Sequence, residues 1–141
     1  MEQKIAHPIA LEAIHFTRSI VIAIPDHKRD SETISIIPEN NIDLLPVDEV
    51  PGRYLATMRT TLNQEGSVTA PYIIDMECIG MFMADKSLSQ EEAMRGVLIT
   101  AHSVLYGAIR EAVSWITGRQ PHGPLMLGLS VLTQKLPENT D

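Results

Sequence analysis

The stretch YIIDMECIGMFMAD, residues 72–85, alternates with the two-residue period of a β-strand, and the rest of the chain is arranged around it. Its even positions, from Tyr72 to Ala84, are all apolar or small, as on a face that packs against a core. Its odd positions place Asp75 and Glu77 in the middle of the opposite face. The other large members of that face are apolar: Ile73, Ile79, Met81 and Met83. We therefore expect this second face to be partly covered, or to bind something.

Three further strands are predicted before this one. Residues 10–24 form a long strand that ends at Pro25, because proline cannot donate to a sheet ladder. Residues 32–45 form a weaker strand that is broken at Pro38, which suits a sheet edge. Residues 53–64 alternate well, and a turn at 65–66 leads into the next strand near Val68, which predicts a hairpin. The first strand is expected to place these apolar residues on one face: Ile14, Phe16, Ile20, Ile22 and Ile24.

After this strand the hydrophobic period changes to that of a helix over residues 89–118. Ser89 and Glu92 have the spacing of a capping box, and Gly118 is suited to a left-handed cap at the end. A continuous helix here is roughly 45 Å long, although Gly96 and Gly107 leave a bend, a break or a close contact open. The apolar stripe comprises Met94, Val97, Leu98, Ala101, Leu105, Ala108, Ile109, Ala112, Trp115 and Ile116.

The order of four strands and one long helix predicts an α+β fold, in which a four-stranded antiparallel sheet has the helix packed on one face. The apolar segment 125–132 is compatible with a strand, a short helix or coil. With 141 residues, the chain is expected to form a single domain over 1–141, with flexible ends at 1–8 and 134–141.

Composition narrows the function classes. The formal net charge of −7 argues against nucleic acid as a partner and suits basic or amphipathic polypeptides. The sequence has no apolar run of transmembrane length and no signal-peptide pattern, so we expect a soluble, cytoplasmic protein. The single cysteine, Cys78, is expected to be a buried, inert thiol. Seven methionines suit surfaces that adapt to varied partners, or they fill the core.

The residue types that carry chemistry point away from an enzyme. None of the five histidines has a partner at metal-ligand spacing, and no phosphate loop or nucleophile elbow is present, so neither a metal nor a cofactor is expected. The strongest catalytic alternative is the pair Asp75 and Glu77, two residues apart on one strand face. Nothing in the sequence supplies a cleft for that pair, and the chain is predicted to be non-enzymatic.

The order of elements and several motifs between Ala10 and Lys135 resemble the SecB family of bacterial export chaperones. The best-matching stretch is LYGAIREAVSWITGRQPHGPLMLGL, residues 105–129. The family has an Arg-Glu pair in its helix, an arginine that ends it, a proline turn and an L-x-L. The residues that fit are Arg110, Glu111, Arg119, Pro124, Leu125 and Leu127. The stretches GMF at 80–82 and FTRSIVIAIP at 16–25 are similar to the fourth and first strands of the family.

This resemblance implies an ATP-independent holdase that binds unfolded polypeptides or preproteins through hydrophobic grooves in protein export. The groove residues that it implies are Ile79, Met81, Phe82, Met83, Leu125 and Leu127, and Asp75 is implied to contact a partner. It also implies dimers through the first strands and helices, and tetramers that are dimers of dimers. The interface residues so implied are Ile14, Phe16, Leu105, Gly107, Ala108 and Ala112.

Some positions depart from the family pattern. Ser19 and Ala23 stand where the family carries acidic residues that contact the translocase motor SecA, and the C-terminal part is shortened. A SecB-like adaptor, or a chaperone dedicated to a labile antitoxin, fits these differences as an alternative without SecA coupling. The client, the involvement of SecA and the choice between dimer and tetramer are left open by the sequence.

Overall fold

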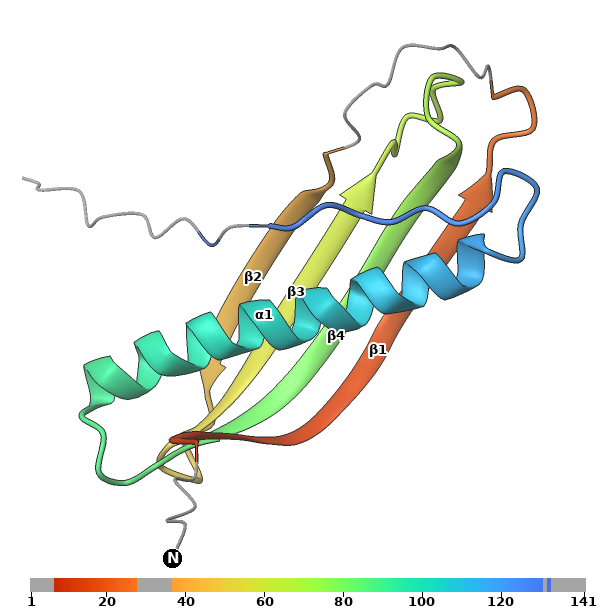
Figure 1. The fold of residues 1–141 in the computed structure, drawn as a ribbon. Coiled ribbons are helices and arrows are strands. Elements are labelled where there is room, and N and C mark those ends of the chain that lie inside the picture. The colour runs from red at the N-terminus through yellow and green to blue at the C-terminus, as the bar shows by residue number, and fades with distance from the viewer. Residues whose placement is uncertain (1–6, 28–36, 131, 133–141) are drawn as a thin grey trace, which may run out of the picture.

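The computed structural model describes residues 7–27, 37–130 and 132. Within them the predicted order of four strands and one helix is confirmed (Figure 1). The elements are β1 Ile9–Ala23, β2 Glu39–Pro46, β3 Arg53–Leu62, β4 Tyr72–Ala84 and α1 Gln90–Thr117. Residues 32–36 of the predicted strand 32–45 lie outside the described residues, and β2 begins directly after Pro38.

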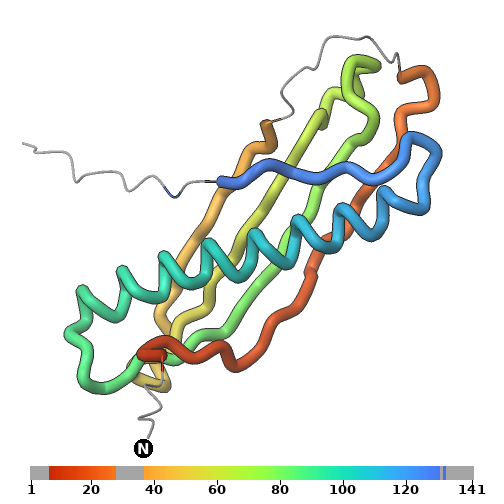
Figure 2. Tube along the Cα trace, viewed as in Figure 1, coloured from red at the N-terminus to blue at the C-terminus, as the bar shows by residue number. Residues whose placement is uncertain are grey.

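All strand pairs are antiparallel, in the order β1-β4-β3-β2, and α1 lies across one face of the sheet (Figure 2). We call this side the helix face and the opposite side the outer face. The α+β fold and the β3–β4 hairpin are thus confirmed, and β2 is an edge strand as Pro38 indicated. β4 begins at Tyr72 rather than near Val68, because the connection is a wider loop in which Asn63 and Gly66 have positive φ angles of 53° and 73°.

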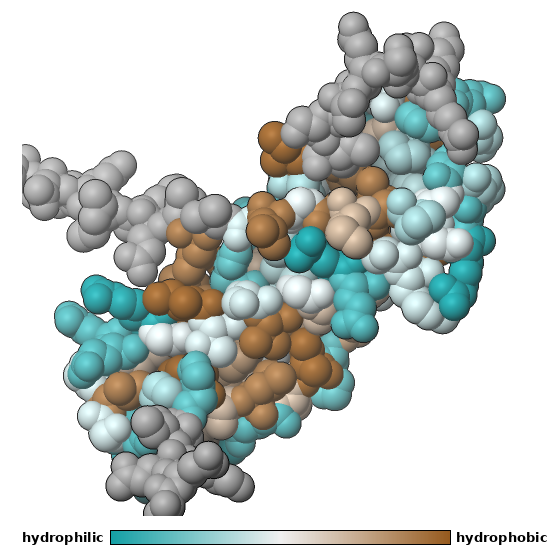
Figure 3. Space-filling model, in the orientation of Figure 1, coloured by the Kyte–Doolittle hydropathy of each residue, from teal (hydrophilic) through white to brown (hydrophobic). Residues whose placement is uncertain are grey.

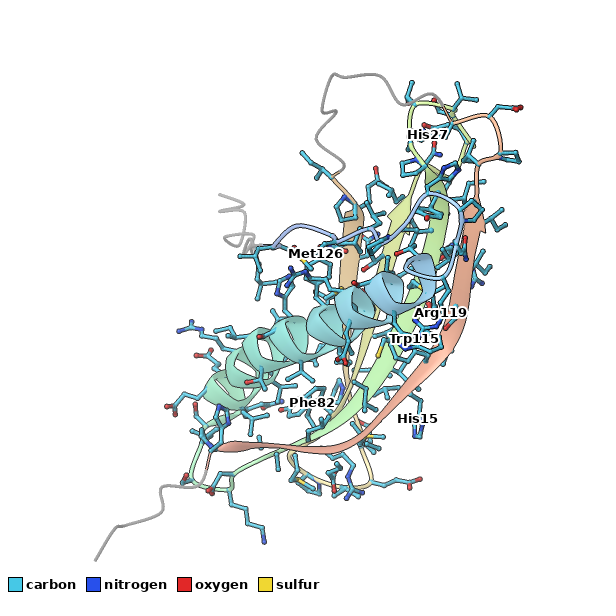
Figure 4. All side chains as sticks on the ribbon, turned by 45° about the vertical axis from the view of Figure 1, so that its right-hand side comes forward. His15, His27, Phe82, Trp115, Arg119 and Met126 are labelled. Carbon is cyan, nitrogen blue, oxygen red and sulfur yellow. The ribbon has the colours of Figure 1, made fainter. Side chains whose placement is uncertain are left out.

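The core lies between β4, β3 and α1. The even-numbered residues of β4 and β3 point toward the helix and are buried, as the alternation predicted. On α1 the buried residues recur every four positions, from Ala93 through Leu105 to Thr117. Gly80 allows this contact, since a Cβ there would lie 2.7 Å from the Phe82 ring and 3.0 Å from Leu105 Cδ2. Phe82 therefore fills the space between sheet and helix (Figure 4).

The prediction that β1 has one continuous apolar face is wrong. Its pairing with β4 is shifted between Leu11 and Ala13 and again between Phe16 and Arg18, so the alternation restarts twice. Ile14 and Phe16 lie beside the inward-facing Gly80 and Cys78, whereas Ile20 lies beside Asp75 on the outer face. Ile22 is on the outer face with Ile20. β1 consequently exposes large apolar side chains on both of its faces.

The helix α1 is continuous over 28 residues, so neither Gly96 nor Gly107 breaks it. The capping box is confirmed, since Glu92 N–H donates to the Ser89 hydroxyl and Ser89 N–H donates to the Glu92 carboxylate. The predicted left-handed cap at Gly118 is wrong, because its φ of −60° is right-handed. The chain reverses a few residues later, where Gly123 has a φ of +78°.

The segment after α1 is extended coil and joins no sheet, which resolves the alternatives for 125–132 in its described part. Residues 124–130 run back along the helix on the helix face (Figure 1). Of the predicted flexible ends, only residues 7 and 8 are described, and the Pro8 carbonyl accepts a hydrogen bond from Asp85 N–H at 2.8 Å.

We predict that Gly80→Ala lowers the free energy of unfolding by about 1–3 kcal/mol, because the added methyl group overpacks the contact with Phe82 and Leu105. The matched control is Gly128→Ala, where no atom lies within 4 Å of the new Cβ, and it should change stability by less than about 0.5 kcal/mol. Urea denaturation at one protein concentration measures both. Equal stability of the two variants would contradict the close packing at Gly80.

Candidate functional site

The outer face of the sheet carries an apolar band that no other described segment covers. Five of its six residues are half-buried, and Leu45 is 64% exposed. The register places them in adjacent rows across all four strands. We define the outer band as Ala13, Leu45, Leu55, Ile79, Met81 and Met83. It includes three of the four large apolar odd positions of β4, whereas Ile73 lies beyond Asp75 and beside Ile22.

Ion pairs lie at the two ends of the outer band. At one end Arg53 donates to both oxygens of Glu12, at 2.8 and 2.9 Å. At the other end Arg59 donates to both oxygens of Asp75 at 3.0 and 2.9 Å, and Arg18 donates to Oδ2 at 2.9 Å. Both groups join β1 to β3 across β4, so they tie the edge strand to the sheet and limit the extent of the band.

The surroundings of Asp75 indicate that its charged carboxylate has a structural role. The hydrogen bond from Arg59, followed by that from Arg18, holds the pKa of this carboxyl below its usual value. Near neutral pH it stays ionised, which is unfavourable for a general acid or base. The neighbouring Glu77 accepts a hydrogen bond from the Thr17 hydroxyl at 2.8 Å instead of sharing a proton with Asp75. This geometry does not favour the catalytic alternative of paired carboxylates.

The six residues that the resemblance implied for one client groove lie on two sides of the sheet. Ile79, Met81 and Met83 belong to the outer band. Phe82 and Leu127 are fully buried in the core on the helix face, and Leu125 is half-buried there. Within one copy of the chain these residues form no common groove, because consecutive strand residues point to opposite faces.

A second exposed apolar surface lies on the helix face, between α1 and the first half of β1 (Figure 3). Ile14 and Phe16 are 36% and 42% exposed there. Leu11 and Ile99 are also exposed in this region. Neither was predicted to be a functional residue, although both are large and apolar in the sequence. We call the set Leu11, Ile14, Phe16 and Ile99 the β1–α1 patch.

The helix residues of the implied interface differ in their environment. Leu105 is fully buried against the sheet, so it belongs to the core of one chain. Ala108 and Ala112 are half-buried beside the core, and Gly107 faces outward with open space around it. Trp115, which the stripe predicted to face the core, is 61% exposed, and the Arg119 guanidinium stacks on its ring at 3.7 Å (Figure 4).

The positions compared with the SecA-contacting acids, Ser19 and Ala23, lie on the helix face, because they pair with Met76 and Tyr72. They therefore share no surface with Asp75. Cys78 is fully buried, and burial raises the pKa of its thiol to about 11, which confirms an inert side chain.

Among the described residues, no group of three or more histidine, cysteine or acidic side chains is arranged to hold a metal ion. No helix in this part of the chain combines the length and the apolar composition that are needed to cross a membrane.

We predict that Asp75→Asn destabilises the fold by about 1 kcal/mol at neutral pH, a small value because both arginines are partly exposed and screened by solvent. Since the pKa of Asp75 is lower in the folded state, its ion pairs stabilise the fold above the unfolded carboxyl pKa of about 3.9. That contribution is lost as the pH falls through the folded pKa. The difference between variant and wild type should therefore vanish in acid.

Chemical denaturation between pH 7 and pH 2 measures this difference. Glu12→Gln, which breaks the exposed pair with Arg53, is the control and should change stability little. A stability difference for Asp75→Asn that persists unchanged at the lowest pH would show that the ion pairs are not its cause.

Comparisons with known proteins place this geometry in context. No family model matches the chain. Over 76 residues the chain is 32% identical to the protein-export protein SecB of Anaplasma phagocytophilum (strain HZ). This match covers 50% of this chain and 48% of that protein. The chain thus spans about half the length of the curated relative that it matches.

Two solved structures share the fold. The SecB-like chaperone Rv1957 of Mycobacterium tuberculosis, solved with a ChAD peptide from the HigA1 antitoxin, has a TM-score of 0.59 at 18% identity. The match covers 87% of this chain and 91% of that one. A Streptococcus agalactiae protein of unknown function has a TM-score of 0.52 at 13% identity, over 89% of this chain and 100% of that one. The chain is thus similar in sequence to a SecB over about half of its length, and over most of its length it is similar in fold to a SecB-like chaperone.

Proposed function

We propose that this protein is an ATP-independent chaperone that holds non-native polypeptides in protein export. The observation that carries the proposal is the pair of exposed apolar surfaces, one on each side of a SecB-like sheet. Exposed apolar surfaces on both faces of the sheet, in a chain with a net charge of −7, are typical of a protein that binds other polypeptides. The sequence similarity to a SecB supports the same class.

The outer band is the proposed client-binding surface. Its width is set by the ion pairs of Glu12 and Asp75, and its centre is formed by Met81 beside Leu55. Methionine side chains adapt to varied apolar partners, because they are unbranched and polarisable. Such a surface selects for exposed apolar side chains rather than for one sequence, which is what a holdase requires.

The β1–α1 patch is the proposed contact between copies of the chain. β1 is an edge strand, so its outer edge can pair with the same strand of a second copy. Two such dimers would then associate through the exposed side of α1 around Gly107, giving a cytoplasmic dimer of dimers. In this arrangement Ile14, Phe16, Ala108 and Ala112 become interface residues, whereas Leu105 stays in the core of each copy.

A chaperone dedicated to one partner is the second candidate. The structural neighbour Rv1957 was solved with a peptide from an antitoxin, which supports a SecB-like sheet in this role. Ser19 and Ala23 carry no charge and lie on the opposite face from Asp75, so SecA coupling through a shared acidic surface is not favoured.

Binding to unfolded chains tests the two candidates. Calorimetry with two unrelated, permanently unfolded polypeptides, and with their folded counterparts as controls, measures the breadth of binding. A holdase binds both unfolded chains and neither folded one. Binding to neither unfolded chain would contradict the general holdase and favour a dedicated partner.

We predict that Met81→Asp weakens binding of both unfolded polypeptides by about tenfold, because it buries a carboxylate against an apolar client. The matched control is Asn41→Asp, which adds the same charge to the outer face of β2, beside Arg59 and outside the band. It should change the affinity by less than about twofold, since it removes no apolar contact. Equal losses in the two variants would show that added charge, and not the band, is responsible.

We also predict that Gly107→Glu lowers the native mass from that of a tetramer to that of a dimer. The new Cβ has no atom within 4 Å, so we expect the fold to be kept, whereas a charge between two helices opposes their contact. Native mass spectrometry measures the change, with Ser87→Glu in the loop before α1 as the control. A tetramer that persists in Gly107→Glu would exclude contact through this side of α1.

A further inference from the structure

The segment 124–130 is bound to the rest of the chain in an unusual way. It is extended, and no hydrogen bond between backbone atoms joins it to any other described residue. Its backbone is held instead by side chains of α1, which it follows in the opposite direction. Figure 4 shows this course, with Met126 on the side away from the sheet.

Three side chains of α1 bind the backbone of the segment. The Thr117 hydroxyl accepts a hydrogen bond from Leu125 N–H at 2.8 Å. Arg110 Nε donates to the Leu127 carbonyl at 2.7 Å, and the Tyr106 hydroxyl donates to the Gly128 carbonyl. One turn further back on α1, His102 Nε2 lies 3.3 Å from the Ser130 hydroxyl. Because backbone groups are common to all residues, these donors and acceptors do not depend on the sequence that they hold.

The side chains of the segment add one apolar anchor. Leu127 is 1% exposed and belongs to the core cluster, and Leu125 is half-buried two residues before it. Met126 and Leu129 point outward and are 73% and 86% exposed. From Leu125 to Gly128 inserted and exposed residues thus alternate, as in an extended peptide bound along a surface, and this alternation ends at the exposed Leu129.

We infer that the channel between α1 and the helix face of β2 and β3 is a binding site for an extended, apolar polypeptide, which residues 124–130 occupy as an intramolecular ligand. The inference rests on the proposed function and adds a regulated site to it. A client segment with aliphatic residues two apart could use Arg110 and Tyr106 in the same way, after displacing the chain's own segment.

The contacts of the segment allow such a displacement. Only Leu127 is fully buried, and no ladder of backbone hydrogen bonds must be broken for the segment to leave. Local opening of this kind costs less than global unfolding when few buried contacts hold a segment. The intramolecular segment then competes with any client that binds in this channel, so it raises the client concentration that is needed for binding there.

Variants of the segment test this competition in the full chain. Leu127→Ala removes the anchor and leaves every residue of the channel wall intact, and Leu125→Ala is a milder second variant. The controls are Met126→Ala and Leu129→Ala, which change exposed side chains of the same segment. The probes are a labelled peptide PHGPLMLGLS, the sequence of residues 121–130, and a permanently unfolded polypeptide, both followed by fluorescence anisotropy.

We expect Leu127→Ala to bind the peptide at least tenfold more tightly than the wild type, and Leu125→Ala about threefold more tightly. The two controls should stay within about twofold of the wild type. Adding the unfolded polypeptide to the wild type should accelerate hydrogen exchange at residues 125–130 and leave β4 protected.

Weaker or unchanged peptide binding by both segment variants would overturn the inference, since it would make the segment a fixed wall of the site. If all variants bind the unfolded polypeptide equally and none binds the peptide, the inference fails while the proposed function stands. If the peptide binds Leu127→Ala but no variant binds the unfolded polypeptide, the channel site is supported and the holdase function fails.

Discussion

The contact between α1 and the buried face of β4 determines the arrangement of the other parts of this molecule. Seven of the nine buried helix residues are four apart, from Ala93 to Thr117, and His102 and Tyr106 lie beside this row. A ridge of residues four apart is inclined by about 26° to the helix axis, so the helix crosses the sheet obliquely. The helix then leaves two regions of the helix face uncovered, one on each side of its axis. The first half of β1 lies in one region and is exposed, and the segment 124–130 occupies the other.

The outer face of the sheet is organised differently from the helix face. No described element packs on it, so its apolar residues and its charges are both close to solvent, and their order along the strands matters. Asp75 is buried among arginines from two neighbouring strands, which keeps a charged group in the sheet at small cost because each oxygen is paired. The same ion pairs interrupt the apolar surface, which limits pairing with unrelated sheets.

The sequence was sufficient for the elements and their order, because hydrophobic periods of two and near four are local properties. The capping box at Ser89 and the edge position of β2 were also predictable from local chemistry. The two register shifts in β1 were not, since they depend on pairing with β4 and leave no glycine in the sequence. For the candidate site, the apolar outer positions of β4 were predicted, and the separation of Phe82 from Met81 already follows from the strand alternation. The position of Leu125 and Leu127 on the helix face follows only from the assembled fold. The role of Arg110 was missed because its acceptor is a backbone carbonyl distant in sequence.

The two bulges in β1 have a consequence for shape. In the first half of the strand Ile14 and Phe16 point to the helix face, whereas in the second half Ile20 and Ile22 point to the outer face and Val21 packs against the core. When two copies of such a strand align in opposite directions, the first half of each lies beside the second half of the other. The bulky Ile14 and Phe16 of one copy and the bulky Ile20 and Ile22 of the other then lie on opposite faces of the sheet, so they do not meet on one side. Large side chains are thereby distributed over both faces along the whole edge.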